Sequence, residues 1–435
     1  MHQINPEQIA RYMNIATADL REGRDARGEA LCQIILDYGD PNHPAALNGI
    51  GAVAWKMGIA DMAHRYFQLA ADASPQNRTY QENLANAAAQ LAQQPSLLNA
   101  AQGPRLLLSK AWGMGFWSDV DHVLGCLLLS ELTHRIPVVH WGDNSLFSDN
   151  PNQDAWRNFF FPVSNVSFSD FEFAGLECFP PKWAGDHLGA GMLNKWRGAY
   201  SRLSPVAFLN RSEPLVVCDF IVQPVALMRW IPAGHPLGSL NIAQVYRYLI
   251  EKYLRPVPEV AAIVDAIAAE HFTGRRVLAV HLRGSDKRKE MEQLDTVNRW
   301  TLQKLDELAA DPDIVIFALT DSHPIAEDLM QRYGQRVLLT RSARSTDDVG
   351  VHYKDNTNEK TLRGREVMID TYLAARADYF IGNGASGVSA MIEHLKDWPP
   401  GALHLMAPNT HYYRNFIIYG TDDLTHTPRA TLEAY

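Results

Sequence analysis

The sequence predicts an α/β protein in which two parallel, doubly wound sheets follow an all-helical N-terminal region. The chain has 435 residues, more than one hydrophobic core usually serves, so two or three domains are expected. Beyond residue 104, short apolar runs alternate with helical segments, as in the βα units of a parallel sheet. Residues before about 100 are rich in Ala, Leu, Gln and Asn and have helical periodicity. The predicted domains are residues 1–100, 104–255 and 256–435.

The composition indicates a globular protein with no general affinity for nucleic acid or anionic membranes. Hydrophobic residues make up 46% and charged residues 20%, and the formal net charge of −9 opposes binding to polyanions. No basic region with an apolar core opens the chain, and no run reaches the roughly 18 apolar residues of a membrane span. The four cysteines form no Cys-x-x-Cys pair. We therefore expect a cytoplasmic protein with reduced thiols and no membrane span.

Small and large apolar residues recur at fixed places in the helical segment that begins at Pro44. These residues are Leu47, Ile50, Gly51, Ala54, Ala63, Phe67 and Ala70, and Pro75 ends the pattern. The order is similar to that of the tetratricopeptide repeat, in which small residues let paired helices approach and large residues fill the groove. Residues 8–41 resemble a degenerate copy, and residues 80–91 resemble a capping helix. The alternative is a helical bundle that only pads the protein.

Residues 93–103 are expected to form a linker to the first α/β domain. The predicted strands there are residues 105–109, 136–141 and 215–222, with a helix at residues 120–134. The first strand ends in a turn with Gly113 and Gly115, which lacks the third glycine of a dinucleotide fingerprint, so no NAD site is expected. Residues 147–214 are rich in aromatics, Pro and Asn. We interpret them as functional loops that contact an acceptor, or as a surface packed by its own aromatics.

The second α/β domain follows two helical segments, residues 242–254 and 260–271. Its predicted strands are residues 277–282, 314–319, 337–340 and 379–381, and its predicted helices are residues 296–310, 324–333, 362–375 and a last one from about 388. This alternation predicts a second parallel sheet.

Polar residues follow the predicted strand at 277–280, where a parallel sheet binds its ligands. They include His281, Arg283, Asp286 and Lys287. A guanidinium fork suits a phosphate, and a lysine adds a point charge. An ordinary solvated charge cluster at the end of a strand explains the same residues equally well.

A second candidate anion site is the turn at residues 382–389. Glycines and backbone N–H groups at a helix N-terminus form an anion site, and Ser386 and Ser389 either add donors or cap the helix. Together with Arg283, this turn suggests a diphosphate clamp without a metal. The acidic pairs Asp347-Asp348 and Asp422-Asp423 are interpreted as solvated loops, and no helix carries histidines at metal-ligand spacing.

Four blocks of the chain resemble one enzyme family in order and approximate spacing. They are GMGFWSDVDHV at 113–123, HLRGSDK at 281–287, LTD at 319–321 and NEKTLRG at 358–364, the last followed by Asp370 and Ser386. The second block resembles the His-x-Arg-x-x-Asp-Lys motif of GDP-fucose-dependent fucosyltransferases, in particular the α1,6 group that includes the nodulation fucosyltransferase. The resemblance spans roughly residues 104–395 and implies two Rossmann-like domains that face a cleft, the GT-B architecture.

The resemblance implies roles for single residues. His281 and Asp370 would hold the guanine, because a carboxylate accepts from its N1–H and amino groups. Arg283 and Ser386 would clamp the β-phosphate of the leaving GDP. The remaining implied donor-site residues are Gly113 and Gly115, which let the backbone close over the diphosphate, Asp286 and Lys287, which shape the Arg283 loop, and Asp321, which supports the nucleotide site. A solvated acid at Asp370 and a satisfied core histidine at His281 are the alternatives.

One position departs from the family pattern. The glutamate that acts as general base in the α1,6 group corresponds to Met291, which Glu290 and Glu292 flank. Either glutamate is a candidate catalytic base, unless the base comes from elsewhere or is dispensable.

These observations predict an inverting, metal-independent glycosyltransferase that moves fucose from GDP-fucose to a hydroxyl of a glycan or protein. The tetratricopeptide-like region would recruit the acceptor, and no cofactor beyond the GDP-sugar donor is expected. The alternatives are a transferase for another GDP-sugar, and an interaction protein whose transferase half binds GDP without turnover.

Overall fold

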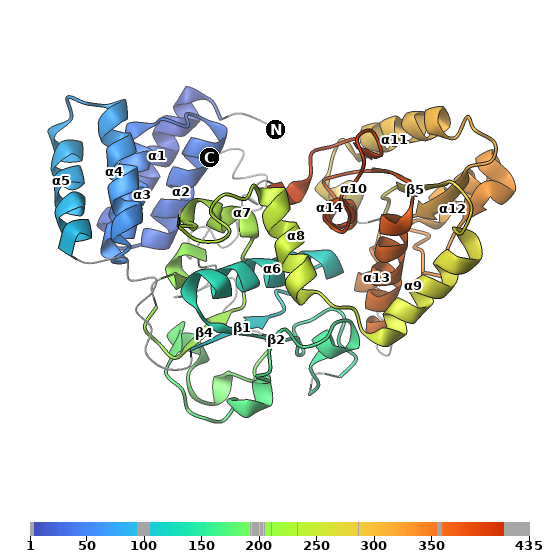
Figure 1. Cartoon of the computed structure of the whole chain (residues 1–435), viewed down its shortest axis with the longest axis horizontal. Helices are drawn as coiled ribbons and strands as arrows, with labels where there is room; N and C mark the ends of the chain where they lie inside the picture. Colours follow the sequence, from blue (N-terminus) through green and yellow to red (C-terminus); the bar gives the residue numbers. More distant parts are fainter. Residues whose placement is uncertain are drawn as a thin grey trace.

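The computed structural model describes residues 4–93, 105–150, 152–191, 193, 200, 203, 205–209, 211–232, 234–285, 287–354 and 359–412. We call described residues 4–93 the helical region, those from 105 to 253 the first unit, and those from 258 to 412 the second unit. Figure 1 shows the blue helical region at one end of the molecule, the first unit in the middle and the second unit at the other end.

The helical region is built from antiparallel helices in which each packs on the next. They are α1 (Pro6–Arg21), α2 (Asp25–Tyr38), α3 (Pro44–Lys56), α4 (Ala60–Ala73) and α5 (Arg78–Gln93). Gly23 and Gly58 turn the chain between paired helices with φ of +78° and +70°. A Cβ at Gly51 would lie 2.6 Å from the Phe67 ring, so α3 and α4 approach closely because this residue is glycine. The pairing follows the expected pattern, while the tetratricopeptide assignment stays a prediction.

Helix α2 joins the helical region to the first unit. Ala30 packs with Trp112, Phe220 and Ile221 of that unit in one buried cluster. Asp37, further along the same helix, forms an ion pair with Arg229. The helical region therefore contacts the turn that follows the first strand of the α/β part.

The first unit contains a parallel sheet in the order β2-β1-β4-β3. Its strands are β1 (Leu106–Lys110), β2 (Ile136–His140), β3 (Cys178–Phe179) and β4 (Leu215–Cys218), and its helices are α6 (Phe116–Thr133), α7 (Pro224–Leu227) and α8 (Ile242–Tyr253). Leu107 packs in the core with Val120 and Val123 of α6. Leu106 and Leu108 point to the opposite face, because neighbouring residues of a strand alternate.

Described residues of the 147–214 segment cover that opposite face. Phe168 and Trp183 from this segment pack against Leu106 and Leu108. Other aromatics of the segment surround Phe116 at the start of α6, with ring centroids 5.0 Å away for Phe159 and 5.2 Å for Phe147. Most of the described aromatics thus pack against one another and the sheet, as the second of the two interpretations expected, whereas Phe161, Phe173 and Tyr200 are exposed. Acceptor contacts from this segment stay a prediction.

The second unit contains a parallel sheet in the order β7-β6-β5-β8-β9. Its strands are β5 (Val277–His281), β6 (Val315–Leu319), β7 (Val337–Leu338), β8 (Tyr379–Gly382) and β9 (Leu403–Leu405). Its helices are α9 (Pro258–His271), α10 (Lys287–Glu290), α11 (Leu294–Leu308), α12 (His323–Tyr333), α13 (Lys360–Arg376) and α14 (Gly387–His394). Because all neighbours are parallel, the loops after β5, β6 and β8 lie at one edge.

The mixed α/β fold with parallel sheets agrees with the sequence prediction. Strands β3 and β9 are absent from the sequence prediction, whereas the equally short β7 lies within the strand predicted at residues 337–340. Residues 94–103 of the expected linker and the pair Asp422-Asp423 lie outside the described residues.

Each helix in the described ranges is too short or too polar to cross a membrane. All four cysteines are buried free thiols.

Candidate functional site

His281 is the last residue of β5 and is buried. Its Nδ1 lies 2.7 Å from the Ser389 hydroxyl in α14. Burial, reinforced by the nearby positive charge of Arg283, lowers the pKa of His281 to about 3, so the ring is neutral near pH 7. Ser389 is fully buried, and a Cβ at Gly382 would lie 2.5 Å from its hydroxyl oxygen. Ser389 thus orients His281, whereas the sequence suggested a phosphate contact or a cap.

Arg283 is anchored by Asp321 at the end of the neighbouring strand β6. The Asp321 carboxylate forms an ion pair with the guanidinium and accepts from the backbone N–H of Gly284 at 2.8 Å and from the Ser285 hydroxyl. The Asn298 amide donates to the Arg283 carbonyl at 2.7 Å. The side chains of Arg283 and Asp321 are only 19% and 15% exposed. The loop after β5 is therefore fixed at both its backbone and its guanidinium.

The pKa of Asp321 shows which influence dominates there. Burial alone would raise the pKa, but Arg283, the Ser285 hydroxyl and the Gly284 N–H outweigh burial and lower it. Asp321 therefore stays ionised and supports the candidate phosphate ligand Arg283. Of the other residues predicted for this loop, Lys287 begins α10 and is half-buried, while Asp286 lies outside the described residues.

Ser386 occupies the N-cap position of α14 and is 5% exposed. Within the described chain its hydroxyl makes no capping hydrogen bond to the helix. The turn before it passes close to other backbone, because a Cβ at Gly384 would lie 2.3 Å from the Ala407 carbonyl oxygen. The first turn of α14 thus keeps backbone N–H groups that a side-chain cap would normally satisfy.

The turn after β1, like the turn after β8, places glycines directly before a helix N-terminus. Gly113 has a φ of +78°, which favours glycine, and Gly115 is the N-cap of α6. Asp119 Oδ1 accepts from the backbone N–H of Gly113 at 3.0 Å and of Met114 at 3.3 Å. As far as the described atoms go, a Cβ at Gly115 would meet nothing within 4 Å. The sequence analysis missed Asp119, although an acid in the first helical turn after a Gly-x-Gly turn is a usable signal.

The N-termini of α6 and α14 converge. A Cβ at Gly387 would lie 3.4 Å from the Trp117 Cβ and 3.9 Å from the Ser118 backbone nitrogen. The Trp117 indole N–H also donates to the Thr371 hydroxyl of α13 at 2.8 Å. Each helix N-terminus carries about half a positive charge. The meeting point of the two units is therefore suited to an anion.

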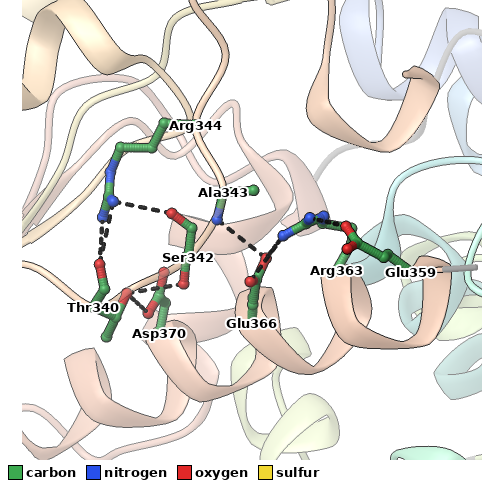
Figure 2. A network of polar contacts seen from close by, with 8 residues as sticks. All are labelled: Thr340, Ser342, Ala343, Arg344, Glu359, Arg363, Glu366 and Asp370. Atoms are coloured by element: carbon green, nitrogen blue, oxygen red, sulfur yellow. Dashed lines mark hydrogen bonds and ion pairs between the residues drawn. The ribbon is translucent and has the colours of Figure 1, made fainter. Parts of the chain in front are cut away.

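Asp370 lies on α13 and faces a loop after β7, as Figure 2 shows. The Thr340 hydroxyl donates to the Asp370 carboxylate at 2.7 Å and lies 2.9 Å from the Ser342 hydroxyl. Burial raises the pKa of Asp370 to about 6, although hydrogen bonds from Thr340 and Ser342 lower it in part. The raised pKa and the hydroxyl partners of Asp370 contradict the alternative of a solvated acid on a helix surface.

Glu366, one turn earlier on α13, holds the same loop (Figure 2). It accepts from the Ala343 backbone N–H at 3.2 Å and from Arg363 at 2.8 and 2.9 Å. Arg344 donates to the backbone carbonyls of Thr340 and Ser342 at 3.0–3.2 Å. Glu366 was not among the predicted site residues, because the loop that it holds is 23 residues away in the chain.

Neither candidate catalytic base, Glu290 or Glu292, is seen in contact with the candidate site among the described residues. Met291 contacts the turn after β8, with its sulfur 3.5 Å from the Asn383 amide nitrogen. Glu292 is exposed between α10 and α11. The side chain of Glu290 lies outside the described residues, so both glutamates stay predictions. No group of three or more His, Cys, Asp or Glu side chains suited to a metal occurs in the part of the chain that the structure describes.

We predict that Asp321→Asn weakens folding by about 2 kcal/mol at pH 7, because the half-buried Arg283 loses its ionic partner. The lowered pKa of Asp321 means that this contribution is full above the ordinary carboxyl value of 3.8 and disappears as the pH falls below it. Denaturant unfolding at several pH values measures the effect. The exposed Asp313→Asn is the control, and equal stability of both variants at pH 7 would contradict the anchoring role.

Comparison with known proteins gives similarity only at the level of solved structures. No protein-family model and no curated protein matches the chain. The structure of fucosyltransferase NodZ from Bradyrhizobium is similar with a TM-score of 0.45 and 17% identity, covering 66% of this chain and 91% of that one. POFUT1 in complex with GDP has a TM-score of 0.43 and 13% identity, with 70% and 99% covered. A variant of Arabidopsis thaliana FUT1 in complex with GDP has a TM-score of 0.42 and 13% identity, with 84% and 88% covered.

Proposed function

We propose that the chain is an inverting, metal-independent glycosyltransferase that moves fucose from GDP-fucose to a hydroxyl of a glycan or protein. The observation that carries the proposal is the convergence of the α6 and α14 N-termini, with Arg283 at the carboxyl edge of the adjoining sheet. In this proposal residues 104–255 and 256–435 are the acceptor and donor domains of a GT-B architecture, and residues 1–100 are a tetratricopeptide-like domain. We also propose a cytoplasmic location, which the four free thiols support.

The positive charge of the site suits the diphosphate of the donor. In the reaction, the bond between the sugar C1 and the β-phosphate oxygen breaks, and the acceptor oxygen bonds to C1 while its proton passes to a base. Negative charge develops on the departing GDP. Arg283, the Ser386 hydroxyl and the two helix N-termini supply donors and positive charge for it, held in place before the reaction by Asp321 and Trp117.

The purine end of the donor fits Asp370 and His281. An ionised Asp370 accepts two hydrogen bonds from the N1–H and amino group of guanine, which adenine does not offer. A neutral His281, fixed by Ser389, has a ring nitrogen that suits a polar edge of the nucleoside. Guanine recognition by this pair is part of the proposal.

The position of the helical region supports the acceptor part of the proposal. Ala30 of α2 packs against Trp112, one residue before Gly113 in the glycine turn. A glycan or protein bound along the helical region would thus reach the donor without a long linker. We propose Glu290 or Glu292 as the base that takes the acceptor proton.

A second candidate function is GDP binding without turnover in an interaction protein. The observation in its favour is Met291, which occupies the position of the expected base and contacts Asn383. Binding of GDP together with absence of transfer and of GDP-sugar hydrolysis would identify this alternative.

The first test is binding of GDP, GDP-fucose, GDP-mannose, UDP-GlcNAc and NAD, each measured by calorimetry with and without EDTA. We expect binding of the guanine nucleotides, preference for GDP-fucose over GDP-mannose, and no effect of EDTA. Arg283→Ala should lower transfer at least a hundredfold with the fold intact, because one preorganised donor to the leaving group is lost. Failure of every guanine nucleotide to bind the wild type would overturn the proposal.

Gly115→Ala distinguishes an effect on ligand binding from an effect on folding. The position has φ −59° and ψ 151°, which alanine adopts readily, and the described atoms leave room for a methyl group. We expect the unfolding free energy to change by less than about 0.5 kcal/mol, since no packed group is disturbed. GDP affinity should fall about tenfold, because the methyl group lies at the helix N-terminus that faces the diphosphate. Unchanged GDP affinity at unchanged stability would place the diphosphate elsewhere.

Asp370→Asn tests guanine recognition through pH. With a folded pKa of about 6, ionised Asp370 destabilises the fold increasingly as the pH rises from 4 to 6, so the Asn variant should be at least as stable as the wild type at pH 7. Its GDP affinity should nevertheless be more than tenfold weaker at pH 7. The phosphate of GDP titrates near pH 6 as well. The decisive quantity is therefore the ratio of wild-type to variant affinity, which should rise from pH 5 to pH 7; a constant ratio would exclude Asp370 from the base site.

A further inference from the structure

The N-terminus of α13 is capped by the first unit. Asp149 accepts from the backbone N–H of Lys360 at 2.7 Å and of Thr361 at 3.1 Å, across 211 and 212 residues of sequence. Glu359, the residue in the N-cap position, makes no side-chain cap bond to the described part of the helix. A carboxylate at a helix N-terminus satisfies free N–H groups and complements the positive end of the helix. Asp149 of the first unit therefore caps α13 in place of a residue next to the helix in the chain.

Further contacts fix the first half of α13 on the same unit. The Arg365 guanidinium donates to the Asn158 carbonyl at 3.1 Å, and the Asn158 amide lies 3.4 Å from the Thr361 hydroxyl. A Cβ at Gly364 would lie 2.6 Å from the Phe159 ring, so the helix approaches these aromatics because it has glycine there. This half of the helix is docked on the first unit by polar and packing contacts together.

The second half of the same helix carries the nucleotide-base residues. Glu366 and Asp370 hold the loop at residues 340–344, and Thr371 accepts from Trp117. From Thr361 to Asp370 the helix rises about 13 Å in roughly two and a half turns, a length over which an α-helix moves as a rigid rod. A shift of α13 as a whole on the first unit would therefore carry Asp370 with it relative to the rest of the proposed donor site.

We propose that α13 couples docking of the two units to binding of the guanine nucleotide, with Asp149 and Gly364 as positioning residues. The inference rests on the proposed donor site and deepens it. Because such coupling is reciprocal, nucleotide bound at Asp370 stabilises the contacts of the α13 N-terminus, and loss of those contacts weakens nucleotide binding by the same factor. The acceptor unit thus regulates donor affinity without touching the purine.

The test combines hydrogen–deuterium exchange with GDP titration of the full chain. Asp149→Ala should speed amide exchange in residues 360–363 and weaken GDP binding roughly fivefold, the equilibrium equivalent of one helix cap. Asp149→Asn keeps an acceptor oxygen and should restore part of both. Asp348→Ala, an exposed acid on a loop of the second unit, is the matched control and should match the wild type in both measurements.

Gly364→Ala gives an independent disturbance, because its methyl group pushes α13 away from Phe159. It should weaken GDP binding in the same direction while the domains stay folded at the temperature of the assay. In the wild type, GDP should slow exchange in residues 360–363. Faster exchange in Asp149→Ala with unchanged GDP affinity would overturn the coupling, and so would GDP binding without protection of these amides.

The proposed function and this inference fail in different ways. If the wild type binds no guanine nucleotide, the donor assignment is wrong, and the exchange of residues 360–363 in the ligand-free variants still decides whether Asp149 caps α13. If GDP binds and exchange in Asp149→Ala equals that of the wild type, the cap is absent and the inference alone is wrong.

Discussion

The site depends on two helix N-termini from different units that are held close together. Two like half-charges repel each other, and the first backbone N–H groups of any helix have no preceding helical carbonyl to bond to. The arrangement persists because packing opposes the repulsion. Phe116 is surrounded by the aromatics Trp141, Phe147 and Phe159, and Trp117 is tied to α13 through Thr371. The close approach of Gly387 to Trp117 leaves little room to relax.

Fixed geometry of this kind suits catalysis better than binding alone. Donors that are already in place cost no reorganisation when charge develops on a leaving group. The same logic explains Asp321, whose charge keeps the guanidinium of Arg283 oriented. The loop around Gly284, held by the Asp321 carboxylate, keeps the positive charge of Arg283 at the carboxyl edge of β5.

Much of the fold followed from local sequence. Strands β1, β5 and β6 were predicted to within about two residues because buried parallel strands are short continuous apolar runs. The position of Arg283 also followed, since a residue just beyond such a strand must lie at the ligand-binding edge. Strand β3 was missed because it lies within residues 147–214, a segment without periodicity whose described aromatics pack on two different faces.

The rest of the site could not be predicted from the sequence, because its partners are distant in the chain. Ser389 bonds His281 across 108 residues, and Asp149 caps α13 across 211. A serine at a helix start is usually a cap, so its role as the partner of a buried imidazole appears only when β5 and α14 are placed side by side. The role of Glu366 also depends on a distant partner. Its ion pair with Arg363 on α13 is that of an ordinary surface acid, and only the folded chain brings the Ala343 backbone N–H to it.

The carboxylates of the proposed donor site differ in how their charges are compensated, which distinguishes a structural role from a proposed binding role. Asp321 has a lowered pKa and a guanidinium partner, so its ionised form stabilises the fold. Asp370 has hydroxyl partners and a pKa raised to about 6, so at pH 7 its ionised form opposes folding. A neutral residue at position 370 would not carry this cost. Under the proposed function, the paired N1–H and amino groups of guanine would donate to this carboxylate beside the Thr340 hydroxyl.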